Sequence, residues 1–299
     1  MVIIKPLDSP CPDFIPIVIV MVITLTGAVD PSPLKGRPDR VQKDFPMSNI
    51  LKGKVALITG GSRGLGAATA EAFADHGADV AISYAASADK AKAVVEKLKA
   101  KGVRAIAIKS DQADLASAKP LIDSVIAEFG KLDILVNNAG IAIQGQLVDD
   151  PDLDGDAYNR QWQVNVLGSI ANTRAAASKL TDGGRIIFIG SLLGSYVPFP
   201  GVADYAGTKT ALAGYAKGIA RDLGRRNITV NVVQPGIMPT DMVSDVAGEL
   251  PDREAILDMH PIRRIATLEE VAQTICFLAG PHAGYITGES INVAGGLGI

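Results

Sequence analysis

From residue 52 onward, two hydrophobic patterns alternate along the chain. Short runs rich in β-branched residues are followed by longer stretches in which apolar residues recur with helical periodicity. The first pattern predicts strands at residues 55–59, 79–83, 104–109, 134–137, 185–190, 229–234 and 290–293. The second predicts helices at residues 65–76, 90–101, 116–129, 156–180, 204–225 and 268–278. Such an alternation is typical of an α/β fold, in which helices cover both faces of a parallel sheet.

The same pattern indicates how the sheet is buried and how many domains form. The run Ile186-Ile187-Phe188-Ile189 is apolar at every position, as expected of a strand covered on both faces. Seven strands and at least six helices follow one another without a break. We therefore expect one domain over residues 47–299, built on a doubly wound, seven-stranded parallel sheet.

Residues 1–46 follow neither pattern. They hold eight of the chain's 17 prolines, and their one apolar run, residues 15–25, is shorter than the about 20 residues that span a bilayer. Lys5 is the sole basic residue ahead of that run, which makes a poor secretory signal. We expect a disordered extension translated upstream of a more natural start at Met47, and no stable membrane span. The alternative is a weak membrane-associating or targeting segment.

Charge and cysteine content narrow the class of protein. The net charge of −3 and the pI near 5.7, with basic residues scattered along the chain, argue against nucleic acid or an anionic membrane as a partner. The two cysteines, Cys11 and Cys276, have neither a neighbouring thiol nor a metal-ligand spacing. They indicate a reducing compartment, so we expect a cytoplasmic protein without disulfides or a metal site.

The first predicted strand runs directly into a glycine cluster, Thr59-Gly60-Gly61-Ser62-Arg63-Gly64-Leu65-Gly66, and an alanine-rich helix follows. Gly60 permits a tight turn, and Gly64 and Gly66 let backbone and helix approach a pyrophosphate closely. The helix amino terminus offers free N–H groups and a positive dipole end to the anion. This context predicts a dinucleotide site of the Rossmann type. The expected contacts are Gly60, Ser62, Arg63, Gly64, Leu65 and Gly66.

The end of the second predicted strand bears on which dinucleotide binds. An acidic residue there grips the ribose 2′-hydroxyl of NAD and would repel a 2′-phosphate. This strand ends in Ser83-Tyr84, with no carboxylate before Asp89, and Arg63 is placed to pair with a 2′-phosphate. The pattern favours NADP(H), with NAD(H) as the alternative, and Ser83 and Tyr84 are further expected cofactor contacts. The alternative interpretation of Arg63 is a solvated loop residue without a role in binding.

A tyrosine and a lysine stand four residues apart in Tyr205-Ala-Gly-Thr-Lys209. On a helix this spacing puts both side chains on one face, within reach of a common ligand. A nearby ammonium favours phenolate over phenol, so we expect Lys209 to lower the pKa of Tyr205 toward neutrality. The pair is a candidate acid–base centre.

Together these motifs resemble the short-chain dehydrogenase/reductase family, and within it the 3-oxoacyl-[acyl-carrier-protein] reductase type. The resemblance covers residue 51 to the carboxyl terminus. It implies the catalytic residues Asn165, Ser191, Tyr205 and Lys209, with Ser191 and Tyr205 also contacting substrate. It further implies cofactor contacts at Asp111, Gln112, Asn138, Ala139, Gly140, Tyr205, Lys209, Pro235, Gly236 and Thr240.

The resemblance also implies a mechanism. In the reduction direction a hydride passes from the nicotinamide to a ketone carbon while Tyr205 protonates the developing alkoxide. Ser191 donates to the carbonyl oxygen, where charge develops in the transition state. Lys209 lowers the tyrosine pKa and hydrogen-bonds the nicotinamide ribose, and Asn165 links Lys209 to solvent as a proton relay.

The chain departs from the family pattern near the catalytic serine. Many relatives have Ser-Ser where this chain has Gly190-Ser191, and the gap from Ser191 to Tyr205 is about one residue longer than usual. We interpret the apolar, proline-stiffened residues 196–201 as a reshaped wall of the substrate pocket. Residues 237–264 correspond to the family's mobile substrate lid. Candidate apolar residues in it are Met238, Met242, Val243 and Leu250.

Three functions stay open from the sequence. The leading one is an NADPH-dependent reductase of a 3-oxoacyl thioester or similar ketone. The second is an NAD(P)-dependent dehydrogenase of a secondary alcohol, sugar or polyol, and the third is a non-catalytic dinucleotide sensor. The family implies a homotetramer. An acyl-carrier protein as partner would need a basic patch, for which the candidates are Arg160, Arg174, Arg263 and Arg264.

Overall fold

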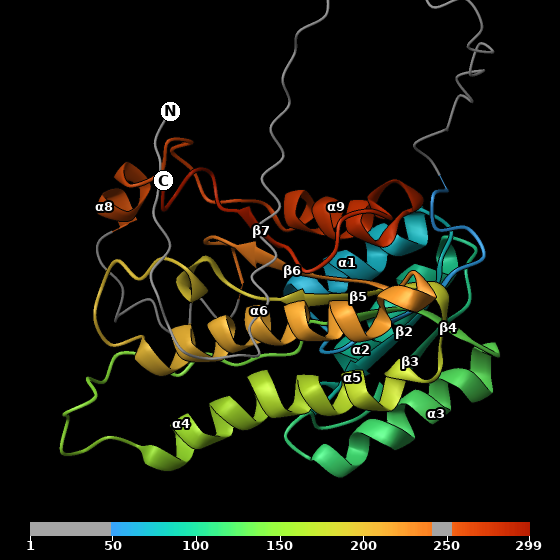
Figure 1. Ribbon diagram of the computed structural model, residues 1–299, viewed down its shortest axis with the longest axis horizontal. Coiled ribbons are helices and arrows are strands. Elements are labelled where there is room, and N and C mark those ends of the chain that lie inside the picture. Colours follow the sequence, from blue (N-terminus) through green and yellow to red (C-terminus); the bar gives the residue numbers. More distant parts are fainter. Residues whose placement is uncertain (1–48, 241–252) are drawn as a thin grey trace, which may run out of the picture. The chain divides into compact units, whose positions relative to one another are not determined.

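The computed structural model describes residues 49–240 and 253–299. Within this part, a seven-stranded sheet has the order β3-β2-β1-β4-β5-β6-β7, and every neighbouring pair is parallel (Figure 1). The predicted single-domain, doubly wound parallel sheet is thus confirmed. The strands are β1 (Val55–Ile58), β2 (Asp79–Tyr84), β3 (Ala105–Lys109), β4 (Leu132–Asn137), β5 (Leu180–Ile189), β6 (Thr229–Pro235) and β7 (Ser290–Val293).

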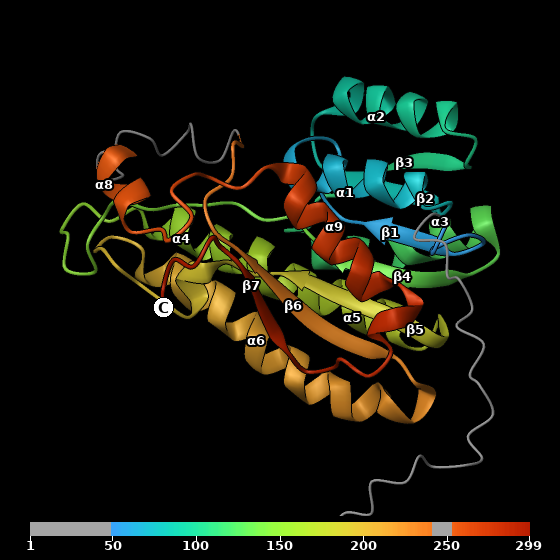
Figure 2. The ribbon, with the colours of Figure 1, turned by 90° about the horizontal axis from the view of Figure 1, so that it is seen from above.

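Helices cover both faces of the sheet, as Figure 2 shows from above. The first face packs against α1 (Gly64–Asp75), α2 (Ala88–Ala100) and α9 (Leu268–Ala279). The second packs against α3 (Ala118–Phe129), α5 (Ser169–Ala177) and α6 (Ala203–Leu223). Side chains of β1 alternate between the two cores, with Ile58 in the first and Leu57 in the second, because successive strand residues point to opposite faces. Both faces are therefore apolar, as the continuous apolar runs predict.

The predicted helix over residues 156–180 is wrong in two respects. It is interrupted: α4 (Gly155–Trp162) passes into a π-helical segment, η2 (Gln163–Gly168), before α5 begins. It is also too long, because Leu180 already belongs to β5 and pairs with Leu132 of β4. The first half of this strand was not predicted because Asp182, Gly183 and Gly184 interrupt the apolar pattern. Leu180 nevertheless belongs to the sheet, since it is buried and pairs with β4.

Short helical segments complete the described part of the chain. Single turns of 3₁₀ helix occur at η1 (Leu115–Ser117), η3 (Leu192–Gly194), η4 (Gly224–Arg226) and η5 (Pro281–Ala283), and α8 (Arg253–Asp258) precedes α9. Of the helices described, none is at once long and apolar enough to cross a membrane. The predicted extension over residues 1–46 and the candidate lid residues Met242, Val243 and Leu250 lie outside the described residues.

The order of the sheet determines where a ligand can bind. The chain builds β1, β2 and β3 outward in one direction and then returns to add β4 on the other side of β1. Loops that leave the carboxyl ends of β1 and β4 therefore diverge, and the crevice between them is where open α/β sheets bind ligands.

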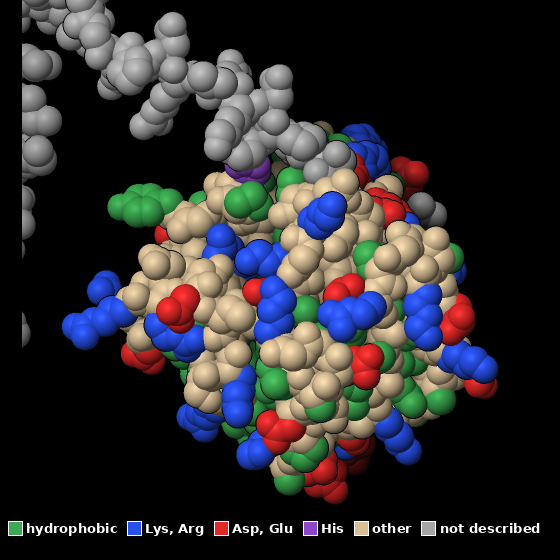
Figure 3. Space-filling model, turned by 90° about the vertical axis from the view of Figure 1, so that its right-hand side faces the viewer, with side chains coloured by type: hydrophobic (Ala, Val, Ile, Leu, Met, Phe, Trp, Pro, Cys, Tyr) green, Lys and Arg blue, Asp and Glu red, His purple; other side chains and the backbone are tan. Residues whose placement is uncertain are grey.

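Charges of both signs are mixed at the amino ends of the strands. Figure 3 shows the face at the right-hand side of Figure 1, where Lys and Arg side chains are interspersed with Asp and Glu. Ion pairs at this end join Arg104 to Asp79 (2.6 Å) and Arg226 to Asp182 (2.8 Å). A face of this kind lacks the continuous positive field that nucleic acid would need.

A buried carboxylate joins three strands at this end of the sheet. Asp133 of β4 is 3% exposed and accepts from the Val55 backbone N–H (2.8 Å), Thr181 Oγ1 (2.8 Å) and Lys131 Nζ (2.9 Å). Burial desolvates this carboxylate and would raise its pKa, but the hydrogen bonds from Lys131, Val55 and Thr181 outweigh that effect. The pKa of Asp133 is consequently lower than usual.

We predict that Asp133→Asn lowers the free energy of unfolding at neutral pH by about 2 kcal/mol, since it removes charged hydrogen bonds from a buried site. A carboxyl with a lowered pKa in the folded state stabilises the fold above its ordinary value of about 4, and this contribution disappears as pH falls through the folded-state value. The deficit of the variant should therefore shrink in acid.

The measurement is urea unfolding of both proteins at several pH values. Asp182→Asn, which removes a mostly exposed partner of Arg226, is the matched control and should change stability by less than about 0.5 kcal/mol. Equal deficits for the two variants, or a deficit for Asp133→Asn that persists in acid, would contradict the assignment.

Candidate active site

A cavity of about 480 Å³ lies at the carboxyl ends of the strands. Its walls come from the loops after β1, β2, β3, β4, β5 and β6 and from the start of α1. All eighteen residues expected to contact a cofactor line it, although they are spread over residues 60–240. Ser191, Tyr205 and Lys209 lie in the same cavity, whereas Asn165 is not among the lining residues.

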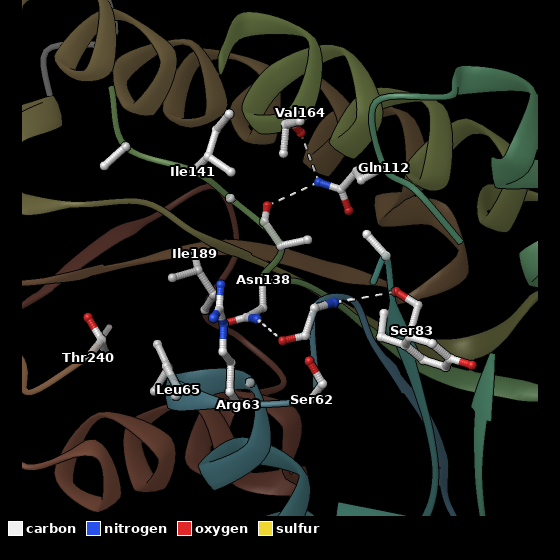
Figure 4. Close-up of a pocket in the computed structure, with 18 of the residues that line it drawn as sticks. Ser62, Arg63, Leu65, Ser83, Gln112, Asn138, Ile141, Val164, Ile189 and Thr240 are labelled. Atoms are coloured by element: carbon white, nitrogen blue, oxygen red, sulfur yellow. Dashed lines mark hydrogen bonds between the residues drawn. The ribbon is translucent and has the colours of Figure 1, made fainter. Parts of the chain in front are cut away.

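The glycine loop approaches its neighbours too closely for side chains. A Cβ at Gly66 would lie 2.4 Å from the Gly60 carbonyl oxygen, and Gly60 itself has a φ of 65°, which favours glycine. Asn138 secures the loop by donating from Nδ2 to the Thr59 carbonyl (2.8 Å) and to the Gly60 carbonyl (3.2 Å). Figure 4 shows the second of these bonds. Gly60 N–H donates in turn to Ser83 Oγ (3.3 Å). The loops after β1, β2 and β4 are thus held together around one backbone turn.

The start of α1 is suited to bind an anion. Gly64, Leu65 and Gly66 line the cavity, no side chain caps this helix, and its first turn carries no acidic residue. The unsatisfied N–H groups and the positive dipole end of the twelve-residue helix therefore face the cavity. Thr240 lies beside this turn, with its Cγ2 3.7 Å from where a Gly64 Cβ would be. The site suits a pyrophosphate.

The charge of the cavity is positive. Among the described residues that line it are three cations, Arg63, Arg160 and Lys209, and one carboxylate, Asp111. Asp111 Oδ2 accepts from Arg160 Nη2 at 3.4 Å, so one cation is partly compensated. The strand end at Ser83 and Tyr84 contributes hydroxyl groups to the wall and no carboxylate. This balance is suited to a ligand with several phosphates.

Gln112 has a structural role that the sequence did not reveal. Its Nε2 donates to the carbonyls of Ala139 (3.0 Å) and Val164 (2.9 Å), as Figure 4 shows, and its Oε1 accepts from Asn172 Nδ2 (3.2 Å). A Cβ at Gly168 would lie 2.3 Å from the Gln112 carbonyl oxygen. Gln112 therefore fixes η2 against the loop after β4, in addition to lining the cavity.

Three of the four expected catalytic side chains come from the loop after β5 and from α6. Ser191 follows β5 after Gly190, and its Oγ accepts from the Leu193 backbone N–H at 3.2 Å, which leaves its hydroxyl proton available. Tyr205 and Lys209 are one turn apart on α6 and are 7% and 4% exposed. Lys209 Nζ donates to the Ile189 carbonyl (3.0 Å) and lies 5.5 Å from the centroid of the Tyr205 ring.

Burial changes the pKa values of both groups on α6. It raises the pKa of Tyr205 to about 12, an effect that a hydrogen bond with Ser191 only partly offsets. It lowers the pKa of Lys209 to about 8. The expectation that Lys209 lowers the pKa of Tyr205 toward neutrality is therefore wrong. The physical reason is desolvation of the phenolate by burial, which outweighs the hydrogen bond with Ser191.

Asn165 lies behind the cavity, in the π-helical segment η2, and is 1% exposed. Its side chain accepts from the Ile141 N–H and donates to the Ile141 carbonyl, both at 2.9 Å. Asn165 Oδ1 and Lys209 Nζ both lie close to the backbone of Gly140: a Cβ added there would be 3.3 Å from the first atom and 3.4 Å from the second. Asn165 thus holds the loop after β4 beside the Lys209 ammonium.

Gly190 explains one departure from the family pattern. A Cβ at this position would lie 2.8 Å from Val232 Cγ1 and 3.2 Å from Gln234 Cγ. A side chain at this position would therefore require Val232 of the neighbouring strand β6 to shift. Ser191 is consequently the hydroxyl that β5 supplies to this part of the cavity.

Comparisons with known proteins agree with this geometry. The family model described as "Enoyl-(Acyl carrier protein) reductase" matches residues 60–298. The 3-oxoacyl-[acyl-carrier-protein] reductase FabG of Staphylococcus aureus is 40% identical over 246 residues, which cover 82% of this chain and 98% of that protein.

Solved structures give the same result. A short-chain dehydrogenase/reductase from Serratia marcescens is 45% identical, with a TM-score of 0.77 over 83% of this chain and 99% of that one. A short-chain dehydrogenase from Burkholderia cenocepacia, solved in complex with NADP, is 43% identical, with a TM-score of 0.77 over the same shares. The chain therefore belongs to the short-chain dehydrogenase/reductase family of NAD(P)-dependent oxidoreductases that interconvert alcohols and carbonyl compounds.

Proposed function

We propose that this protein reduces a ketone to a secondary alcohol with NADPH, using Tyr205 as the acid. The substrate is a 3-oxoacyl thioester or a similar carbonyl compound. The observation that carries the proposal is one cavity that contains both the glycine loop and the group Ser191, Tyr205 and Lys209. The proposal keeps the homotetramer implied by the family and the cytoplasmic location expected from the cysteines.

The lining residues fit a dinucleotide. The glycine loop and the start of α1 would hold the pyrophosphate, and the loop with Asp111 would hold the adenine. Pro235, Gly236 and Thr240 would contact the nicotinamide end, and Lys209 its ribose. Arg63 and the strand end at Ser83 and Tyr84 support NADP(H) over NAD(H). When bound, the cofactor supplies the hydride that reduces the carbonyl carbon.

The raised pKa of Tyr205 supports the reduction direction. With a pKa of about 12, the phenol is protonated at neutral pH and has a proton to donate. As the carbonyl carbon is reduced, its oxygen gains the charge of an alkoxide, which is more basic than a phenolate. The proton passes from the Tyr205 oxygen to that alkoxide oxygen and leaves a phenolate. Water is limited at this point because Tyr205 is 7% exposed.

Ser191 and Lys209 stabilise the two charges that this transfer creates. The Ser191 hydroxyl, oriented by the Leu193 N–H, donates to the substrate oxygen while charge develops there. The charged form of Lys209 stabilises the phenolate that remains on Tyr205. In this proposal Asn165 keeps the loop after β4 beside Lys209 and takes part in the return of a proton to the site.

Two other functions differ from this proposal in testable ways. Oxidation of a secondary alcohol, sugar or polyol would use Tyr205 as a base and would consume the oxidised cofactor instead of NADPH. A dinucleotide sensor needs no acid, whereas this chain carries Asn165, Ser191, Tyr205 and Lys209. A substrate panel with NADPH, spanning acetoacetyl thioesters, quinones, diketones and sugars, distinguishes the three functions.

The four candidate arginines give limited support to an acyl-carrier protein as partner. Arg263 pairs with Asp258, Arg264 pairs with Glu270, and Arg160 contacts Asp111. Arg174 hydrogen-bonds Tyr215 on the second face of the sheet. Little uncompensated positive charge remains among them, which favours a small-molecule ketone over one presented by a carrier.

We predict that Tyr205→Phe lowers kcat for ketone reduction by at least about 100-fold, because it removes the proton donor and little volume. The dissociation constant for NADPH should change by less than about threefold, since the cofactor is held mainly by the glycine loop. Steady-state kinetics and fluorescence titration check both values. The control is Tyr285→Phe, which alters a fully exposed phenol. Comparable turnover by Tyr205→Phe and wild type would refute the mechanism.

Cofactor choice gives a second prediction. Arg63→Ala should raise KM for NADPH by about 10-fold, the loss expected for one charged hydrogen bond to a phosphate. KM for NADH, which has no 2′-phosphate, should stay nearly constant. The same measurement on Arg225→Ala, an exposed arginine in η4, controls for net charge. A wild type that prefers NADH would show that Arg63 and the strand end at Ser83 were misinterpreted.

The pH dependence of reduction gives a third prediction. Lys209 has a pKa of about 8, so its charge is lost as pH rises through that value, while Tyr205 stays protonated to about 12. We therefore expect kcat/KM for reduction to fall above about pH 8. Lys209→Arg keeps a positive charge throughout, so its residual activity should lack this decline. Identical pH profiles for the two proteins would contradict the assignment.

A further inference from the structure

The carboxyl-terminal tail, residues 294–298, packs against the catalytic end of the cavity. Leu192, Ala294 and Leu297 form a small apolar cluster separate from the two main cores, and each is less than 10% exposed. Leu192 follows Ser191 directly. Gly298, with a φ of 92°, fits against Tyr196, whose Cγ would be 3.1 Å from a Cβ at that position. The end of the chain is thus in contact with both ends of the segment 192–196.

The turn that orients Ser191 lies between this tail and α6. Ser191 Oγ accepts from Leu193 N, so the direction of its hydroxyl depends on the 3₁₀ turn η3. On the α6 side, a Cβ at Gly194 would lie 3.1 Å from Lys209 Cβ, and Thr210 Oγ1 donates to the Gly194 carbonyl at 2.6 Å. On the tail side, Leu192 at the start of the turn shares an apolar cluster with Ala294 and Leu297. A shift of η3 would therefore move Ser191 relative to Lys209.

The tail is itself held by two neighbouring segments. Ile262 N–H donates to the Gly295 carbonyl at 3.0 Å, and a Cβ at Gly296 would lie 2.7 Å from Pro261 Cγ. Gly236 lines the cavity and lies against Ala294: a Cβ added to Gly236 would be 3.0 Å from the Ala294 Cα. In Figures 1 and 2 the carboxyl terminus lies at the end of the sheet where α8 and the loop before α4 also lie.

We propose that Leu297 is a positioning residue for the reaction. By packing on Leu192 it fixes η3, and it so keeps the Ser191 hydroxyl within hydrogen-bond reach of the substrate oxygen. This inference rests on the proposed function for the role of Ser191, but the packing it describes is independent of it. Leu297 is not among the residues that line the cavity. Its loss should thus affect the chemical step more than dinucleotide binding.

The test compares full-length wild type with Leu297→Ala, Leu297→Met and Ile299→Ala. Leu297→Ala empties the space beside Leu192, Leu297→Met refills it, and Ile299→Ala shortens a fully exposed side chain in the same tail. Two quantities are measured. One is hydrogen–deuterium exchange of the peptide over residues 190–197. The other is kcat for a ketone that wild type reduces, with the dissociation constant for NADPH measured beside it.

For Leu297→Ala we expect faster exchange in this peptide and a kcat lowered by about 10- to 100-fold, the range that misplacement of a catalytic group produces. NADPH binding should change by less than about twofold. Leu297→Met should restore both quantities, and Ile299→Ala should match wild type. If Leu297→Ala does not fold, Leu297→Val, which is one methylene smaller than leucine, serves in the same comparison.

Unchanged exchange over residues 190–197 in Leu297→Ala would overturn the proposal, and so would faster exchange with an unchanged kcat. Equal effects of Leu297→Ala and Ile299→Ala would overturn it as well, because they would show a general dependence on the tail. A wild type that reduces no ketone in the panel would refute the proposed function. The exchange data would still decide in that case whether Leu297 fixes the turn.

Discussion

The burial of one ammonium group is the constraint on which the arrangement of the catalytic end depends. Lys209 is 4% exposed, and a charged amine removed from water costs free energy unless polar groups surround it. The Ile189 carbonyl at the end of β5 accepts a hydrogen bond from this ammonium, and the Tyr205 ring lies on another side of it. The backbone of Gly140 lies so close that a Cβ added to it would be 3.4 Å from Lys209 Nζ. Satisfying this group requires β5, α6 and the loop after β4 to meet at one point.

Because these elements meet at one point, the cavity has two parts with different electrostatic environments. Backbone N–H groups at the start of α1 and the cations of the lining supply positive potential for a ligand with phosphates. At Tyr205 the environment is different, since burial keeps a phenol neutral and a neighbouring serine orients it. One part of the cavity therefore presents positive potential to a ligand, while in the other Tyr205 stays neutral beside Lys209 until a reaction creates charge on it. The fold separates these tasks by placing them on loops from different strands.

The sequence predicted the lining of the cavity well because its motifs lie at the ends of apolar strands, where the topology of the sheet brings them together. It failed where the outcome depends on contacts between distant residues. Leu180 is a strand residue because Leu132, far along the chain, pairs with it. The pKa of Tyr205 rises because residues from several loops exclude water around it. Gln112 could be assigned to the cavity, but its bonds to Ala139, Val164 and Asn172 require three separate elements to be placed first.

The π-helical segment η2 has a consequence for the evolution of this chain. A π turn accommodates an additional residue, so α5 is rotated relative to α4 by roughly 100° compared with an uninterrupted α-helix. Loss of one residue between Gln163 and Gly168 would bring the two helices back into phase. Gly168 would then no longer face Gln112, and Asn165 would turn away from Ile141. The segment can accept substitutions at its exposed Leu167. Its length, by contrast, is fixed by the geometry on either side, so insertions and deletions accepted elsewhere on the surface are excluded here.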